Sequence, residues 1–203
     1  MLRVKICGIT SVEDARLALD AGADLLGLIF CASPRQVTLE CAAAVAAATD
    51  PRILVGVFAD PSLEEVSSVL DVVPMGAVQL HGAESSELIG ALSRRVRVIK
   101  AVWRHADAVR ALGAGCPILL DAPPARRGAR ADWQLGRELA DQTSLYLAGG
   151  LNASNVARAV AEVRPFAVDV CSGVEESPGR KSAAAVRDFI RAAKGASDVE
   201  QLA

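Results

Sequence analysis

The sequence has few aromatic residues, little net charge and no long uninterrupted apolar stretch. Phe, Trp and Tyr make up 3% of its 203 residues, which argues against the aromatic stacking platforms that bind single-stranded nucleic acids. The formal net charge of −2 excludes a broad basic field, so we expect neither a nucleic acid nor a membrane surface as partner. Gly, Asp or Arg interrupts every apolar run before it reaches the roughly 18 residues of a membrane span. Any anionic ligand must therefore be held by local geometry.

The chain also lacks the cysteine spacing of a disulfide framework or a zinc site. Its cysteines are odd in number, widely spread and in neither CxxC nor Cys/His spacing; they are Cys7, Cys31, Cys41, Cys116 and Cys171. No metal site is expected. Free thiols fit a reducing compartment, and the first residues lack the regions of a signal peptide. We therefore expect a cytoplasmic protein.

Short runs rich in Val, Ile and Leu alternate with longer segments of helical period, a pattern typical of repeated βα units. The expected strands are Leu2–Cys7, Asp24–Phe30, Ile53–Phe58, Ala77–Leu80, Val96–Val102, Pro117–Asp121, Ser144–Ala148 and Phe166–Val170. Helices are expected within 12–49, around the second strand and its loop, and over 62–73, 84–94, 104–113, 133–142, 152–164 and 181–194. Ser11 with Asp14, Ser62 with Glu65 and Asn152 with Asn155 stand where helix caps belong.

Eight such units without a linker or a composition break favour a closed (β/α)8 TIM barrel over an open doubly wound sheet. We expect residues 1–195 to form one catalytic domain. Residues 196–203 have no clear period, so we expect a frayed tail there.

Polar or reactive side chains gather at the carboxyl ends of the expected strands. They are Cys7, Gln79, His81, Lys100, Asp121, Asp169 and Cys171. The carboxyl ends of barrel strands form the usual active-site mouth, and burying many ionisable groups is unfavourable unless they are paired or serve a site. Lys5 shares the inward face of Cys7, and the first and eighth strands adjoin in a closed barrel, so we predict an internal Lys5–Asp169 pair.

Two glycine-containing turns follow the last two expected strands, at Ala148–Leu151 and Cys171–Val174. Free backbone N–H groups at such turns bind anions without a basic side chain, and the loops after strands seven and eight of barrels commonly hold phosphate. The turns predict a phosphate site. Neither GxxxxGK[ST] nor GxGxxG is present, which argues against nucleotide binding by those motifs.

Simpler explanations exist for single residues. A free cysteine is usually an inert small hydrophobe, Asp121 could cap a helix, and His81 could be a hydrogen-bonded core histidine. Arg126, Arg127 and Arg130 fit a solvated loop.

Together the motifs resemble one family. They are KICGIT at 5–10, SPR at 33–35, QLHG at 79–82, LLD at 119–121, DW at 132–133, LAGGL at 147–151, VDV at 168–170 and SGVE at 172–175. In this order, along essentially the whole chain, they closely resemble the phosphoribosylanthranilate isomerase family.

The resemblance implies an Amadori rearrangement of N-(5-phosphoribosyl)anthranilate to 1-(2-carboxyphenylamino)-1-deoxyribulose 5-phosphate, an aldose–ketose isomerisation of the intramolecular oxidoreductase class. It implies Cys7 as general base, Asp121 as general acid and Arg35 as the clamp for the anthranilate carboxylate. The other implied roles are phosphate binding by Gly149, Gly150, Ser172 and Gly173, a ribose hydroxyl contact by Asp169, and a site-lining place for His81. No cofactor is expected, since the substrate's own amine accepts the electrons. The partner is a small phosphorylated molecule, and the chain is a monomer or a homodimer.

The sequence also departs from the family. The segment 122–131 replaces a common Gly-Gly-Thr/Ser-Gly stretch, Cys171 stands where serine is common, and Asp60 replaces a usual asparagine. Two alternatives stay open. One is another sugar-phosphate barrel enzyme, such as an indoleglycerol-phosphate synthase or a histidine-pathway isomerase, which would rely on lysine or paired aspartates. The other is a barrel that binds phosphorylated ligands without catalysis.

Overall fold

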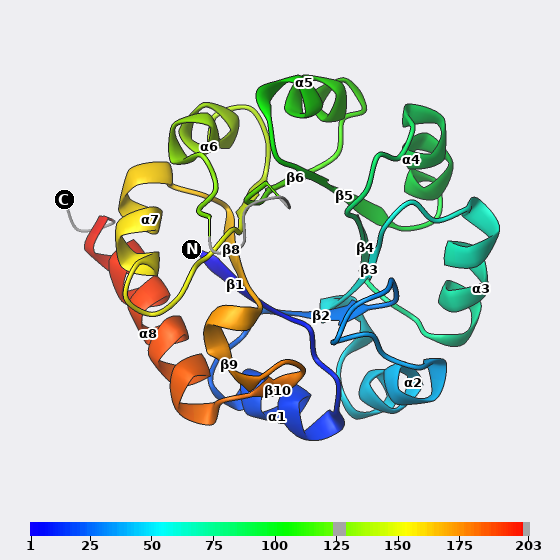
Figure 1. Ribbon diagram of the computed structural model, residues 1–203, viewed down its shortest axis with the longest axis horizontal. Coiled ribbons are helices and arrows are strands. Elements are labelled where there is room, and N and C mark those ends of the chain that lie inside the picture. The colour runs from blue at the N-terminus through cyan, green and yellow to red at the C-terminus, as the bar shows by residue number, and fades with distance from the viewer. Residues whose placement is uncertain (124–128, 201–203) are drawn as a thin grey trace.

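The computed structural model describes residues 1–123 and 129–200, and their strands close into a parallel barrel (Figure 1). The order is β1 to β8, and β8 pairs with β1 to close the ring. The expected (β/α)8 TIM barrel is confirmed. The strands are β1 Arg3–Cys7, β2 Leu25–Ile29, β3 Leu54–Phe58, β4 Ala77–Leu80, β5 Arg97–Val102, β6 Ile118–Leu120, β7 Leu145–Leu147 and β8 Ala167–Val170.

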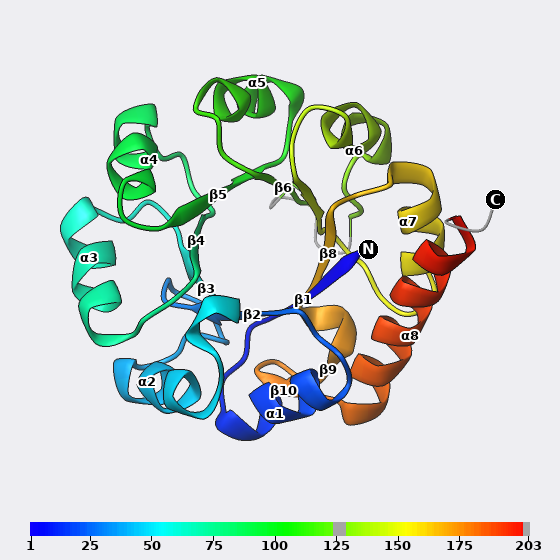
Figure 2. The same ribbon diagram turned by 180° about the vertical axis from the view of Figure 1, so that it is seen from behind.

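Helices surround the barrel, as both views show (Figures 1 and 2). They are α1 Val12–Asp20, α2 Leu39–Ala48, α3 Leu63–Val72, α4 Ser86–Ser93, α5 His105–Gly113, α6 Trp133–Ala140, α7 Val156–Val163 and α8 Ala183–Glu200, with short 3-10 helices η1 Pro51–Ile53 and η2 Ser172–Val174. Two expected caps are confirmed. The Ser11 hydroxyl accepts from the backbone N–H of Asp14, and Ser62 with Glu65 forms a reciprocal capping box. No helix in the described part of the chain is long and apolar enough to cross a membrane.

The strands divide their side chains between two environments. Outward-facing Val4 and Ile6 of β1 are fully buried in a cluster with helix residues such as Phe189. Inward-facing residues of the other strands, such as Val55 and Leu119, form a second cluster inside the barrel. This alternation follows from the pleat of each strand.

The turn after β7 differs from expectation. Helix α7 begins at Val156 rather than near Asn152. The Asn155 carboxamide does not cap it, but accepts from the backbone N–H of Asn152 and donates to the carbonyl of Gly150, both at 2.9 Å. The two asparagines therefore brace the Gly149–Gly150 turn.

Helix α8 continues to Glu200, beyond residue 195 where the expected domain ends. Lys194 ties the helix to the body of the protein by donating to the carbonyl of Gly22 at 2.7 Å. The Ser197 hydroxyl in turn donates to the carbonyl of Lys194. Residues 201–203 lie outside the described residues, as do Arg126, Arg127 and the rest of 124–128 in the segment that departs from the family.

A small hairpin precedes α8 and was not expected from the sequence. It consists of β9 Glu175–Ser177 and β10 Arg180–Lys181, and Gly179 between them has a positive φ of 85°. The Thr10 hydroxyl donates to the carbonyl of Gly179. The hairpin is thus fastened to the loop between β1 and α1 (Figure 1).

Candidate active site

Lys5 lies inside the barrel at the centre of the candidate site. Its side chain is fully buried, and Nζ donates to Asp169 Oδ1 at 2.9 Å and to Gln79 Oε1 at 3.0 Å. Lys5 and Asp169 are register partners across β1 and β8, and the predicted ion pair is confirmed. Burial raises the pKa of Asp169 to about 7, although the charge of Lys5 opposes the rise. Burial would lower the pKa of Lys5, but the charges of Asp169 and Cys7 outweigh it and raise that pKa.

Cys7 ends β1 and is 5% exposed. Its thiol fills the space beside Gly27, where a Cβ would lie 2.6 Å from the sulfur. A hydrogen bond from Cys171 holds the pKa of Cys7 well below its ordinary value; burial opposes this effect, and the charges of Lys5 and Lys181 support it. The same bond, together with burial, raises the pKa of Cys171. Cys7 therefore favours the thiolate, while Cys171 favours the thiol, whose Sγ also lies 3.9 Å from Glu175 Oε1.

Asp121 and His81 form the more open side of the mouth. Asp121 directly follows β6, and its Oδ1 accepts from the backbone N–H of Ala122 at 2.6 Å. Its Oδ2 lies 3.3 Å from His81 Nε2, and the two side chains are 28% and 26% exposed. The imidazole also packs edge-on against Trp103. A ligand at the mouth can therefore reach this carboxyl group.

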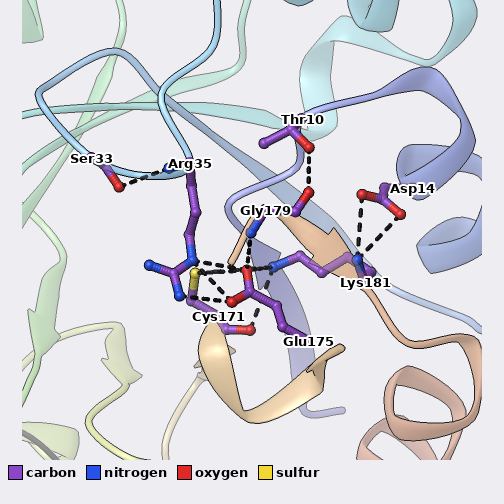
Figure 3. Close-up of polar contacts among 8 residues, drawn as sticks. All are labelled: Thr10, Asp14, Ser33, Arg35, Cys171, Glu175, Gly179 and Lys181. Carbon is purple, nitrogen blue, oxygen red and sulfur yellow. Dashed lines mark hydrogen bonds and ion pairs between the residues drawn. The ribbon is translucent and has the colours of Figure 1, made fainter. Parts of the chain in front are cut away.

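Arg35 is bound by the carboxylate of Glu175 (Figure 3). The guanidinium donates from Nε to Oε1 at 2.8 Å and from Nη2 to Oε2 at 2.7 Å. Lys181, fully buried in its side chain, approaches the same carboxylate from the opposite side with Nζ 2.9 Å from Oε1. Burial would raise the pKa of Glu175, but the hydrogen bonds from Arg35 and Lys181 lower it. Since Arg35 follows β2 and Glu175 begins β9, this network joins two distant segments.

The two glycine turns lie next to each other, and their geometry requires glycine. Gly149 and Gly150 have φ values of 81° and 67°, and a Cβ on Gly149 would lie 2.7 Å from the Ala122 nitrogen. A Cβ on Gly173, in η2, would lie 2.1 Å from the Leu151 carbonyl oxygen. The turn after β7 therefore contacts both the segment after Asp121 and η2, where Ser172 is exposed.

Most of the predicted residues surround one end of the barrel. The charges of both Cys7 and Asp121 act on Asp169, and Lys5, Gln79 and His81 link these positions by hydrogen bonds. Lys100, which the sequence placed among the polar strand ends, does not join them. Its Nζ instead donates to the carbonyl of Gly82 and pairs with Glu84 at 2.9 Å.

Three residues of this network had no role assigned from the sequence: Gln79, Glu175 and Lys181. Gln79 and Glu175 both lie within the motifs quoted above. Gln79 could have been found because it shares the inward face of its strand with His81. No local pattern marks Lys181, because its contact with Glu175 depends on the β9–β10 hairpin.

The chain matches a family model and many curated relatives over nearly its full length. The model, N-(5'-phosphoribosyl)anthranilate (PRA) isomerase, matches residues 4–192. An N-(5'-phosphoribosyl)anthranilate isomerase from Pelobacter propionicus is 43% identical over 96% of both chains. The enzyme of the same name from Geobacter sulfurreducens is 45% identical over 96% of this chain and 100% of its own.

Solved structures agree with the sequence matches. The phosphoribosyl anthranilate isomerase from Thermotoga maritima superposes with a TM-score of 0.89 and 43% identity, over 96% of this chain and 100% of that one. A phosphoribosyl anthranilate isomerase in complex with reduced 1-(o-carboxyphenylamino)-1-deoxyribulose 5-phosphate gives a TM-score of 0.86 with the same identity and coverage. The barrel, the site at its mouth and these matches together show that this chain belongs to the N-(5'-phosphoribosyl)anthranilate isomerase family.

Proposed function

We propose that this chain catalyses the Amadori rearrangement of N-(5-phosphoribosyl)anthranilate to 1-(2-carboxyphenylamino)-1-deoxyribulose 5-phosphate, as an intramolecular oxidoreductase of the aldose–ketose type. One observation carries the proposal. A thiol with a lowered pKa and an accessible carboxyl group flank Asp169 at one end of the barrel. Such a pair of groups suits proton removal and proton donation on neighbouring atoms of one sugar.

The first step assigns the acid to Asp121. Its protonated carboxyl group donates to the ring oxygen of the ribose, the C1–O bond breaks, and the lone pair of the anthranilate nitrogen forms a C1=N double bond. The position of Asp121 at the accessible side of the mouth supports this role. The carboxylate left behind keeps the hydrogen bond from the Ala122 N–H, and a bond to an ionised acceptor is stronger.

The second step assigns the base to Cys7. Its thiolate takes the proton from C2, the C2–H electron pair forms C1=C2, and the C=N pair returns to nitrogen. The resulting enol tautomerises to the ketone. The substrate nitrogen is the electron acceptor, so the step needs no separate electron sink. The neighbouring cations Lys5 and Lys181 support the thiolate.

Arg35 is proposed to bind the anthranilate carboxylate. Glu175 accepts from Nε and from one N–H of Nη2, which leaves the Nη1/Nη2 edge of the guanidinium for a second carboxylate. That edge can bind a carboxylate with two parallel hydrogen bonds. The charges of Lys181 and Glu175 offset each other, so the charge of Arg35 remains for the substrate.

The phosphate is proposed to bind at the adjoining turns, through backbone N–H groups of Gly149, Gly150 and Gly173 and the hydroxyl of Ser172. Asp169 would accept from a ribose hydroxyl, and His81 would line the sugar. The contact between the two turns at Gly173 and Leu151 supports a single phosphate site. A phosphate there and a carboxylate on Arg35 would hold the two ends of the substrate.

We place the reaction in the cytoplasm, because all five cysteines are free thiols and such thiols persist in reducing compartments. The chain is proposed to act as a monomer or homodimer. A crystal structure from Thermotoga maritima concerns monomers generated from a dimeric phosphoribosylanthranilate isomerase.

The test is the loss of phosphoribosylanthranilate fluorescence with purified protein. We expect turnover by the wild type and nearly none by Cys7→Ala. Unchanged activity in Cys7→Ala would favour a sugar-phosphate barrel enzyme that uses lysine or paired aspartates. Binding of substrate in calorimetry without turnover by the wild type would instead favour a barrel that only binds phosphorylated ligands.

A further inference from the structure

A chain of polar contacts leads from the buried Lys5 through Gln79 and His81 to Asp121. Lys5 Nζ lies 3.0 Å from Gln79 Oε1, Gln79 Nε2 lies 2.9 Å from His81 Nδ1, and His81 Nε2 lies 3.3 Å from Asp121 Oδ2. Gln79 is 1% exposed, so its amide has no access to bulk water. The oxygen and the NH2 group of Gln79 must therefore find their partners within the protein.

Lys5 fixes the direction of this chain. An ammonium group donates and cannot accept, so the oxygen of Gln79 must face Lys5. The second bond of Lys5, to Asp169 at 2.9 Å, prevents the ammonium from turning away. The NH2 group of Gln79 then faces His81 and donates to Nδ1.

A donor at Nδ1 determines the protonation state of His81. The ring nitrogen that accepts from Gln79 carries no proton, so the imidazole is neutral and its N–H is on Nε2, which faces Asp121. An imidazolium would place an N–H on Nδ1 against the NH2 of Gln79. His81 therefore holds no second proton at this side of the site.

We propose that Gln79, oriented by Lys5, is a positioning residue that keeps His81 as the neutral Nε2–H tautomer directed at Asp121. The proposal deepens the function given above and rests on Asp121 as the general acid. When Asp121 loses its proton, Oδ2 faces His81 Nε2 at 3.3 Å and Oδ1 accepts from the Ala122 N–H. Both contacts strengthen as negative charge develops, which stabilises the transition state more than the ground state.

The first test needs no variant. The chain has two histidines, and His105 is exposed at the start of α5, so it serves as the internal reference; His81→Asn assigns the signals. Nitrogen-15 NMR at a pH where both rings are neutral should show His81 with an unprotonated Nδ1 and a protonated Nε2. His105 should show a mixture of tautomers. A proton on Nδ1 of His81 would overturn the proposal.

Variants of Gln79 then connect the tautomer with catalysis. Gln79→Met removes the donor at similar length, so His81 should lose its tautomer preference. A positioned general acid contributes about 10²–10⁴-fold, and partial loss of its positioning should lower kcat about 10–100-fold with little change in KM. Gln79→Glu supplies an acceptor instead, so Nδ1 should become protonated. The control is Gln142→Met, an exposed position before β7 at the other end of the barrel, which should match the wild type.

The outcomes separate the two proposals. A folded Gln79→Met protein that keeps both the wild-type tautomer and the wild-type kcat would overturn the role of Gln79. If that variant does not fold, the wild-type tautomer and Gln79→Glu decide. Absence of isomerase activity in the wild type would refute the proposed function, whereas the tautomer measurement would still report whether Gln79 orients His81.

Discussion

The outward and inward faces of the barrel strands have different roles, although their residues alternate along each strand. On β1, Val4 and Ile6 point toward the helices and are fully buried among apolar side chains. Lys5 and Cys7 point inward and are nearly as buried, but they belong to a network of charges and hydrogen bonds. Equal burial therefore does not mean equal function.

The comparison shows where stability and chemistry reside. Apolar burial on the outer face stabilises the fold by roughly 25 cal/mol for each Å² removed from water. The buried ion pair of Lys5 with Asp169 offers no comparable gain, since desolvation offsets much of the attraction between charges. Its presence inside the barrel is better explained by the site than by folding.

The largest effect on catalysis is expected from substitutions on the inner face. Cys7→Ala and Asp121→Asn should each lower kcat by about 10²–10⁴-fold, because each removes a proton-transfer group. Both proteins should keep the urea midpoint of the wild type within a small margin. Cys116→Ala is the control, since Cys116 is buried among apolar residues away from the mouth; loss of activity in that variant would weaken the division between the faces.

Substitutions on the outer face should lower stability and leave catalysis nearly unchanged. Ile118 on β6 is fully buried in the outer cluster, and Ile118→Ala should lower the free energy of unfolding by about 2–5 kcal/mol by leaving a cavity. Chemical denaturation measures this loss. The kcat of the folded variant should stay close to that of the wild type, and a fall comparable to that of Asp121→Asn would contradict the comparison.

A smaller effect is expected at Glu175, which holds Arg35 at the edge of the site. Glu175→Gln loses the charge that orients the guanidinium, so KM should rise about 10-fold, equivalent to about 1.4 kcal/mol, while kcat changes less. Glu176→Gln is the matched control, because Glu176 is half exposed and pairs only weakly with Arg180. Equal kinetics for the two variants would show that Glu175 does not position Arg35.

The smallest effect concerns pH. The hydrogen bond from Cys171 lowers the pKa of Cys7, so Cys171→Ala should raise that pKa. The thiolate is then lost at a higher pH, which moves the acidic limb of the kcat/KM profile upward and leaves the alkaline plateau unchanged. Cys171→Ser keeps a hydroxyl donor and should retain most of the wild-type profile. Identical profiles for the Ala and Ser variants would remove the hydrogen bond as the cause.

Much of the fold could be predicted because its signals are local. Alternating apolar runs and helical segments gave the order of the strands, and Ser62 with Glu65 marked a helix start that the structure contains. The pairing of Lys5 with Asp169 was also predictable, because closure of a barrel makes its first and last strands neighbours. Helix α8 runs past its expected end at residue 194 to Glu200, and its anchor, the bond from Lys194 to Gly22, joins residues 172 apart in the chain.

The sequence by itself determined the barrel, the pair of inward faces at β1 and β8, and the glycine turns, because strand period and backbone conformation are properties of neighbouring residues. Only the tertiary structure decided that Lys181 meets Glu175, that Cys171 lowers the pKa of Cys7, and that Lys100 pairs with Glu84 instead of joining the site. Those contacts depend on how separate loops approach one another. The neighbours that each ionisable group at the mouth acquires in this way determine its charge. No local sequence pattern specifies those neighbours.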